Sequence, residues 1–470
     1  MDLTEEILIK QRAFFKAGHT LNPAGRKAAL QILENTIKEM EEEILDALKQ
    51  DLGKCNTESY MCEVGLVLRQ IKHCRRHIAC WTRPKIALTP LAQFPSRSRI
   101  IPEPYGNVLI MAPWNYPFLL SISPLVSALT AGNTAIVKPS TQAKATQKVI
   151  KKIIEETFTE DYVAVLDGER EDFANLLDHK FDYIFFTGSK SFGRTVMEKA
   201  SANLTPVTLE LGGKCPVIVD STSDIEVAAR RVVFGKFLNV GQTCVAPDHV
   251  FVQETVAQAF QDACITAIVA TYGSHACSSP DYGKIINERH FNRLLATLEE
   301  SRGFVVFGGE VFPETLQISP TLLRIGCIED RTQSGKYVID SLRLMKDEIF
   351  GPLLPIVTYN DASDLLEYVG EHQYPLASYI FTGDKRIKKV LTHQMHFGGG
   401  CVNDTVIHLA TENMPFGGIG DSGMGQYHGK WGFDTFTHYK SVVDKATWLD
   451  LQMRYPPYTP RKRDLIRRFL

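Results

Sequence analysis

Short apolar runs that alternate with helical patterns are the feature of this chain that most restricts its fold. The runs 106–111, 133–137 and 183–186 have the length and composition of buried strands. A helical pattern follows each run, as at 118–131, and a second series of the same kind begins near 216–219. Strands and helices that alternate in this way form parallel sheets with helices on both faces. We therefore predict an α/β protein with two doubly wound domains.

The remaining segments complete this outline. Residues 3–50 and 57–81 have helical patterns, and the second series continues with strands expected at 249–252, 354–357 and 378–381. The stretch 85–104 interrupts the alternation, because it is rich in proline and its arginines alternate with serine and isoleucine. Such a segment is typical of an extended arm outside the core.

The composition excludes several classes of protein. With 44% apolar residues the chain has ample side chains for a core, so disorder is not its dominant state. The 52 basic and 54 acidic residues give a net charge of −2, which provides no field for binding nucleic acid. No stretch approaches the ~20 apolar residues that span a bilayer, and the acidic N-terminus is unlike a secretory signal peptide. Ten scattered cysteines without a Cys-x-x-Cys pair indicate a reducing, cytoplasmic compartment.

Two residues are candidates for catalysis. Cys244 follows Gly-Gln-Thr on an expected tight loop, where an electropositive or helix-terminal setting would lower the thiol pKa toward neutrality. The alternative for this residue is a packed loop cysteine. Glu210 lies between two leucines at an expected strand end, where apolar surroundings raise a carboxyl pKa and suit it to proton transfer. Its alternative is a structural ion pair with a neighbouring Lys or Arg.

Two turns that follow expected strands offer binding groups. Asn115 lies in a Pro-Trp-Asn-Tyr-Pro turn at the carboxyl edge of the sheet, where its amide N–H can stabilise an oxyanion. Residues 186–193 are a strand end, a Gly/Ser turn and a helix start, whose backbone N–H groups suit phosphate. Residues 418–423 match G-x-G-x-x-G, but no strand or helical period accompanies them, so we interpret them as a flexible glycine loop.

Two further patterns receive structural interpretations. His73, His77 and Cys80 share one helical face, but three ligands among basic neighbours do not make a metal site, and no metal is predicted. The tail 453–470 is basic, and we favour a docked terminal arm over a membrane-surface or nucleic-acid role.

The chain resembles the NAD(P)-dependent aldehyde dehydrogenases through six motifs in family order: PWNYP (113–117), VKPS (137–140), FTGS (186–189), LELGGK (209–214), GQTC (241–244) and EIFGP (348–352). The resemblance covers essentially the whole chain, and the segments 414–425, 427–430 and 454–458 are similar to the class 3 branch in particular. It implies two Rossmann-like domains and a small β bridging element. Members of this branch take medium- and long-chain or aromatic aldehydes.

The resemblance assigns roles to individual residues. Cys244 would attack the aldehyde to give a thiohemiacetal, and the Asn115 side chain with the Cys244 backbone N–H would form the oxyanion hole. After hydride transfer, Glu210 would activate the water that hydrolyses the thioester. The cofactor, NAD and/or NADP, would be bound by Trp114, Lys138, Thr141, Thr187, Gly188, Ser189, Glu348 and Phe350.

Thr141 departs from the pattern of many NAD-preferring members, in which a glutamate at this place binds the adenosine ribose hydroxyls. A carboxylate repels the 2′-phosphate of NADP, whereas a threonine hydroxyl does not. We therefore expect NADP to be accepted as well as NAD. The presence of Glu210 favours a free carboxylic acid as the product, because relatives that pass the acyl group to coenzyme A generally lack it.

The resemblance also implies a division of the chain and an oligomeric state. The expected parts are a cofactor-binding domain (1–84 and 102–208), a catalytic domain (209–425), a bridging element (85–101 and 426–452) and the basic tail (453–470). The bridging element is expected to pair with a second subunit, which predicts a homodimer.

The expected function is NAD(P)-dependent oxidation of apolar aldehydes to carboxylic acids. Tyr116, Phe234, Leu238 and Phe416 are candidates for the substrate pocket, since they flank motif residues. Two alternatives are a cofactor-independent cysteine esterase or hydrolase, which leaves two motifs unexplained, and a catalytically silent scaffold. Retention of Cys244 together with the other motif residues argues against the scaffold.

Overall fold

The computed structural model describes residues 2–168, 175–372 and 374–469. The chain begins with the helices α1 (Leu3–Lys16), α2 (Pro23–Glu39), α3 (Glu41–Leu52), α4 (Asn56–Ser59) and α5 (Gly65–Trp81), with a π-helical turn at Tyr60–Val64. Local signals set their ends. The Asn22 side chain accepts a hydrogen bond from the Ala24 N–H, and Pro23 occupies the first turn of α2.

The first sheet has six strands in the spatial order β17-β7-β6-β3-β4-β5. They are β3 (Asn107–Met111), β4 (Thr134–Lys138), β5 (Val163–Val165), β6 (Tyr183–Thr187), β7 (Val207–Glu210) and β17 (Gly423–Met424), connected in part by α6 (Pro117–Ala131), α7 (Lys144–Thr157) and α8 (Lys190–Ser201). All neighbours are parallel except β17 and β7. The chain order reverses between β3 and β6, which is where doubly wound sheets bind ligands.

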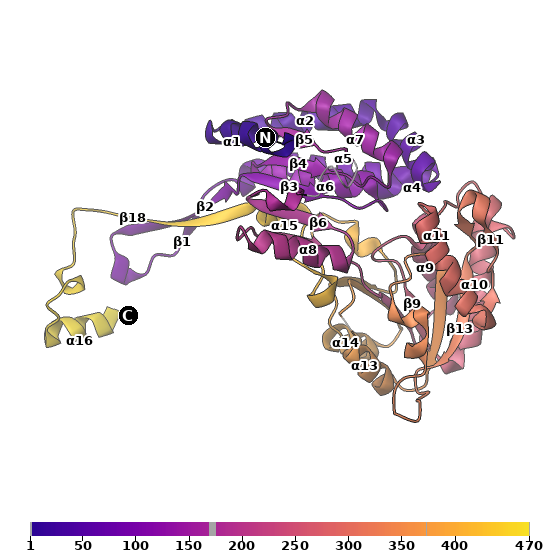
Figure 1. The fold of residues 1–470 in the computed structure, drawn as a ribbon. Helices are drawn as coiled ribbons and strands as arrows, with labels where there is room; N and C mark the ends of the chain where they lie inside the picture. The colour runs from indigo at the N-terminus through magenta and orange to yellow at the C-terminus, as the bar shows by residue number, and fades with distance from the viewer. Residues whose placement is uncertain (1, 169–174, 373, 470) are drawn as a thin grey trace.

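The second sheet has seven strands in the order β10-β13-β14-β9-β8-β15-β16 and is parallel except at β10. Its strands are β8 (Pro216–Val219), β9 (His249–Gln253), β10 (Val305–Phe307), β13 (Thr321–Cys327), β14 (Leu353–Tyr359), β15 (Ala377–Phe381) and β16 (Gly399–Val402). Its helices are α9 (Ile225–Phe237), α10 (Ala257–Tyr272), α11 (Glu288–Glu300), α12 (Arg343–Lys346), α13 (Ala362–Glu371) and α14 (Lys385–Gln394), and a small hairpin joins β11 (Val311–Phe312) to β12 (Gln317–Ile318). The two lobes in Figure 1 confirm the predicted α/β fold with two doubly wound sheets.

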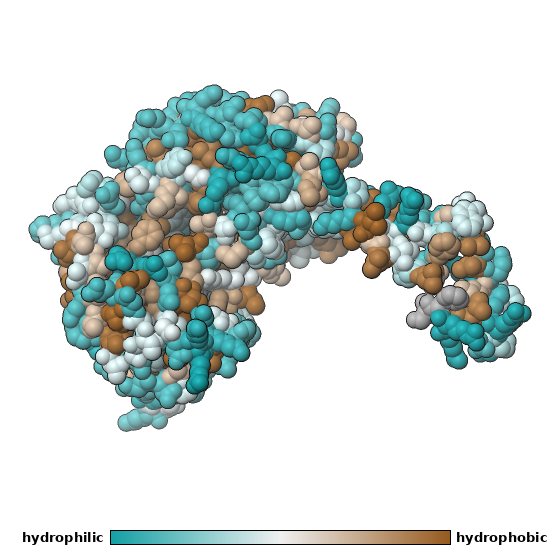
Figure 2. All heavy atoms as spheres, turned by 180° about the vertical axis from the view of Figure 1, so that it is seen from behind, coloured by the Kyte–Doolittle hydropathy of each residue, from teal (hydrophilic) through white to brown (hydrophobic). Residues whose placement is uncertain are grey.

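A third, antiparallel sheet forms an arm that projects from the lobes (Figure 1). It consists of β1 (Lys85–Ala87), β2 (Ser96–Pro104) and β18 (Thr437–Lys445), and α15 (Gly429–Thr435) precedes β18. Figure 2 shows hydrophobic side chains exposed along the arm, and Leu88 and Trp448 are 101% and 73% exposed. The proline-rich stretch thus forms the extended arm that the sequence predicts.

The C-terminal tail differs from its sequence interpretation as a docked arm. Helix α16 (Pro460–Phe469) lies at the far end of the projecting arm, away from both lobes of its own chain (Figure 1). Most of its side chains are exposed, because basic residues occupy so many positions that no broad apolar face is left to pack. Among the helices that the structure describes, each is too short or too polar to cross a lipid bilayer.

The glycine loop 418–423 also differs from expectation. Gly423 and Met424 form the short strand β17, which pairs with β7 so that Gly423 lies opposite Glu210. Gly423 has φ 144°, and a Cβ there would lie 2.2 Å from the Leu209 carbonyl oxygen, so only glycine allows this approach. A strand of two residues has no periodicity, and for that reason the sequence pattern did not reveal it.

Candidate active site

A cavity of about 330 Å³ lies where the carboxyl edge of the first sheet meets the amino edge of the second. Residues after β3, β6 and β7 line one side, and residues that precede β9 and β14 line the other. The structure brings together nine of the predicted site residues here: Trp114, Asn115, Thr187, Gly188, Ser189, Glu210, Cys244, Glu348 and Phe350.

Cys244 lies in a turn between α9 and β9, in which the Ala246 N–H donates to the Thr243 carbonyl. Asn239 and Val240 have φ 50° and 55°, a left-handed conformation that ends the helical segment and directs the chain into this turn. Burial raises the pKa of the Cys244 thiol to about 12, helped by Glu348 and Glu210. The ionisable neighbours that act on this thiol are carboxyl groups, and both favour its neutral form.

Glu210 is the last residue of β7 and is 3% exposed. Neither carboxyl oxygen has a hydrogen-bond partner among the described residues. Burial alone raises the pKa of Glu210 well above its usual range. The alternative of a structural ion pair is wrong, and what remains is a buried carboxyl group with free proton-accepting positions in the cavity.

Asn115 is fixed by hydrogen bonds at both ends of the residue. Its side-chain Nδ2 donates to the Gln242 carbonyl at 3.0 Å, which leaves the second hydrogen of this amide for another acceptor. Its own carbonyl accepts from Lys54 Nζ at 3.0 Å and from Asn239 Nδ2 at 2.7 Å. The side-chain nitrogen of Asn115, rather than its oxygen, therefore faces the segment that carries Cys244.

An aromatic wall borders the same cavity. The ring of Trp114 lies 4.6 Å from His290 and 5.4 Å from Phe350, measured between ring centroids. Arg293 donates to the Ile349 carbonyl at 2.8 Å and so holds the segment that carries Phe350. His290 and Arg293 were not found from the sequence. Their spacing places them on one face of α11, but no local pattern indicates what that face meets.

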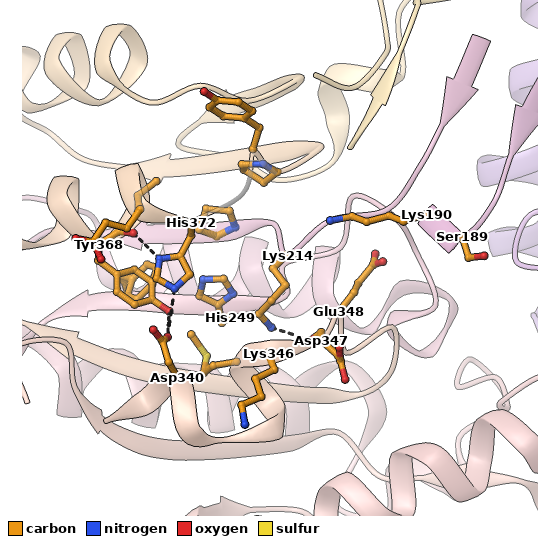
Figure 3. Close-up of a pocket in the computed structure, with 18 residues that line it drawn as sticks. Ser189, Lys190, Lys214, His249, Asp340, Lys346, Asp347, Glu348, Tyr368 and His372 are labelled. Atoms are coloured by element: carbon orange, nitrogen blue, oxygen red, sulfur yellow. Dashed lines mark hydrogen bonds and ion pairs between the residues drawn. The ribbon is translucent and has the colours of Figure 1, made fainter. Parts of the chain in front are cut away.

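Glu348 lies between this cavity and a second one of about 600 Å³. Figure 3 shows Ser189, Lys190 and Glu348 on one side of the second cavity and His372 on the other. Burial and the nearby Asp248 raise the pKa of Glu348 to about 8. A Cβ on Gly212 would lie 2.1 Å from Glu348 Oε2, so the glycine leaves room for this carboxyl group.

Lys138 and Thr141 lie apart from the residues above. Lys138 ends β4, one strand further from the reversal point, and its Nζ donates to the Gly168 carbonyl at 3.3 Å. Neither residue is among those that line the two cavities.

A third cavity, of about 180 Å³ and almost entirely apolar, meets the first at Cys244. All four predicted pocket residues line it: Tyr116, Phe234, Leu238 and Phe416. The Tyr116 hydroxyl lies 2.6 Å from Thr243 Oγ1, beside the nucleophile. Glu412 and His428 also line it. His428 belongs to a motif that the sequence displays, but the motif by itself does not place the ring in a cavity.

Within the described residues no group of three or more His, Cys, Asp or Glu side chains is arranged to hold a metal ion. His73 and His77 instead contact each other with tilted rings, whose centroids are 4.3 Å apart. The site contains a thiol, a buried carboxyl group and an amide donor on a Rossmann-type fold. These three groups lie together at the edge of the first sheet.

The chain belongs to the aldehyde dehydrogenase family, whose model matches residues 4–442. It is 45% identical over 462 residues to 4,4′-diaponeurosporen-aldehyde dehydrogenase of Staphylococcus aureus, covering 97% of each chain. It is 40% identical to aldehyde dehydrogenase family 3 member H1 of Arabidopsis thaliana, covering 98% of this chain and 93% of that protein. The substrate-bound structure of Staphylococcus aureus AldH matches all of both chains with a TM-score of 0.95 and 43% identity.

These similarities confirm the family and the class 3 resemblance inferred from the motifs. The protein is therefore an aldehyde dehydrogenase, an oxidoreductase that acts on aldehydes.

Proposed function

We propose that this enzyme oxidises apolar aldehydes to carboxylic acids with NAD or NADP, through a thioester on Cys244. The observation that carries the proposal is that Cys244 lines both the apolar cavity and the cavity at the reversal point of the first sheet. An aldehyde in the apolar cavity and a dinucleotide at the sheet edge would therefore meet at one sulfur atom.

The residues of the cavity of about 330 Å³ at the sheet edge fit a dinucleotide. The N-terminus of α8 presents backbone N–H groups after Gly188, with Ser189 as its N-cap. The Trp114–Phe350 wall offers flat apolar surface, and Glu348 offers an acceptor for ribose hydroxyl groups. Thr187, at the end of β6, lines the same cavity, and Lys138 and Thr141 would reach the adenosine end. When bound, the nicotinamide supplies the acceptor for a hydride.

The protein's own groups would perform the remaining chemistry. The Cys244 thiol loses its proton to water in the cavity, and its sulfur adds to the aldehyde carbon. The free hydrogen of the Asn115 amide stabilises the resulting oxyanion. Loss of hydride from that carbon leaves a thioester. Glu210 then takes a proton from water, which attacks the thioester and releases the acid and the thiol.

An apolar substrate is supported by the lining of the third cavity and by the name of the Staphylococcus aureus relative, which specifies a long apolar aldehyde. The test is a panel of linear aldehydes of increasing length, benzaldehyde and a carboxylated semialdehyde. We expect kcat/KM for NAD(P)H formation to rise with aliphatic length, because each buried CH₂ contributes about 0.8 kcal/mol. Preference for the charged semialdehyde would contradict the proposal.

The cofactor prediction concerns Thr141. We expect comparable kcat/KM values for NAD and NADP, and a more than thousandfold preference for NAD would contradict this. Thr141→Glu should lower kcat/KM for NADP by about tenfold, since it sets a carboxylate against the 2′-phosphate. Thr141→Gln has the same shape without the charge and is the matched control, which should leave the NADP value within about threefold.

We also propose a homodimer, in which the arm of one chain is covered by a second copy. Exposed apolar residues gather there and include Ile86, Leu88, Leu91 and Trp448. The mass in solution, from light scattering after gel filtration, should be twice the chain mass of 52.7 kDa. Leu88→Asp should shift the population toward one chain mass, with the matched surface change Leu204→Asp as control. A single-chain mass for the unmodified protein would exclude the dimer.

Two further expectations stay proposals. The ten cysteines are all free, which supports a reducing, cytoplasmic location. The two large sheets and the arm support a division into a cofactor-binding domain, a catalytic domain and a bridging element.

A further inference from the structure

A buried ion pair lies behind the active-site cavity and has no part in the chemistry described above. Lys54 and Glu63 are both 0% exposed, and Lys54 Nζ donates to Glu63 Oε1 at 2.6 Å. Lys54 follows the end of α3, and Glu63 lies in the π-helical turn between α4 and α5. Turns of this kind are frequent at functional sites.

The ammonium group of Lys54 is directed at the backbone of the oxyanion-hole residue. It donates to the Asn115 carbonyl at 3.0 Å and lies 3.9 Å from the centroid of the Tyr116 ring. It therefore contacts the residue that would donate to the oxyanion and the next residue, whose ring forms a wall of the apolar cavity. Lys54 itself does not line any of the three cavities.

The carboxylate of Glu63 holds the other end of the same turn. Its Oε2 accepts from the backbone N–H groups of Phe118 and Leu119 at 3.0 and 3.1 Å. These groups belong to the first turn of α6, whose N-cap residue Tyr116 provides no side-chain cap. Glu63 thus caps α6 although it belongs to a distant segment of the chain. A negative charge at this end of the helix also interacts favourably with the helix dipole.

A second anchor comes from the segment that carries the nucleophile. Asn239 Nδ2 donates to the Asn115 carbonyl at 2.7 Å, and the Asn239 N–H donates to Glu58 Oε1 at 2.8 Å. The Asn115 carbonyl is therefore held from both sides. The backbone of Asn115 is thereby fixed, and its side-chain amide is held in turn by the hydrogen bond from Nδ2 to the Gln242 carbonyl.

We propose that Lys54 and Glu63 are positioning residues that fix the Asn115 amide for oxyanion stabilisation. A buried ion pair contributes little net stability compared with an apolar pair of the same size, but its hydrogen bonds have defined directions. These hydrogen bonds hold the Asn115 carbonyl and the first turn of α6. The inference rests on the proposed role of Asn115, and its test separates the two.

The test is a double-mutant cycle on kcat with the full-length enzyme. Lys54→Met combined with Glu63→Gln removes both charges and leaves neither one buried without a partner. We expect kcat and kcat/KM to fall together by at least about tenfold, because a displacement near 1 Å at a catalytic group can lower the rate 10²-fold. The dissociation constant for NAD(P), from fluorescence titration, should not change.

The cycle is completed in the Asn115→Ala background, where the same pair of changes should lower kcat by no more than about twofold, because residues that act through one another are not additive. Equal losses in both backgrounds would overturn the inference. An Asn115→Ala enzyme with unchanged kcat would instead overturn the oxyanion role of Asn115. If the double variant does not fold, Glu63→Gln alone is measured in the same cycle, with an expected loss of at least about threefold and the same criteria.

Arg26, a residue of α2, provides a matched control because it contacts the same helix α6. It is buried and donates to the Thr130 and Ala131 carbonyls at the other end of α6. Arg26→Met should lower Tm and leave kcat within about twofold. If kcat falls in this variant as much as in the Lys54/Glu63 variant, any weakening of α6 lowers kcat. That result would overturn the positioning role of Lys54 and Glu63.

Discussion

Replacing Cys244 with alanine is expected to lower kcat for NAD(P)H formation by at least about 10⁴-fold, since no covalent intermediate can then form. The thiol lines both the apolar cavity and the cavity of about 330 Å³ at the sheet edge. The loss should appear in the absorbance of the reduced cofactor at saturating aldehyde. Binding of the nucleotide should persist, because the wall formed by Trp114 and Phe350 is unchanged.

Cys277→Ala is the matched control for this experiment, because Cys277 is also a free, partly buried cysteine but lies outside the active-site cavities. It should retain the activity of the unmodified enzyme. A Cys244→Ala enzyme that keeps more than about one hundredth of the activity would contradict the mechanism. Ester cleavage that needs Cys244 while NAD(P)H production does not would favour the hydrolase alternative.

Replacing Glu210 with glutamine is expected to separate hydride transfer from thioester hydrolysis. The first turnover should still produce about one equivalent of NAD(P)H per active site, while the steady-state rate falls by about 10²- to 10⁴-fold. Both oxygens of this carboxyl group lack partners among the described residues, so the change removes a proton acceptor and breaks no hydrogen bond that the structure contains. Rapid mixing with absorbance detection measures the burst and the steady state in one experiment.

The pH dependence gives this prediction a second readout. Burial holds the pKa of Glu210 well above its usual range, so the proton-accepting form becomes more abundant as the pH rises. The rate limited by hydrolysis should therefore increase with pH in the unmodified enzyme. This increase should be absent in Glu210→Gln. Glu34→Gln, at a buried carboxylate paired with Lys38, is the control and should leave burst and steady state unchanged. Loss of the burst in Glu210→Gln would mean that Glu210 acts before hydride transfer.

The sequence predicts the elements of this fold well because their signals are local. Asn22 and Pro23 start α2 through a cap and a fixed φ, and the apolar run at 107–111 can be buried only as a strand or a helix segment. The chemistry of the candidate site is local in the same sense, since Cys244, Glu210 and Asn115 each lie in a recognisable motif. The short strand β17 is not predicted from the sequence, because two residues are too few to show a strand periodicity.

What the sequence alone determined about this protein is therefore its α/β class, its family and the identity of its reactive groups. The tertiary structure decided how those groups are tuned: Glu210 has no ion-pair partner, and Cys244 lies beside carboxyl groups rather than cations. It also decided that Lys54 is buried against Asn115, a residue 61 positions away in the chain. Burial and charge pairing depend on which distant segments pack together, and no local pattern distinguishes this lysine from a solvent-exposed one.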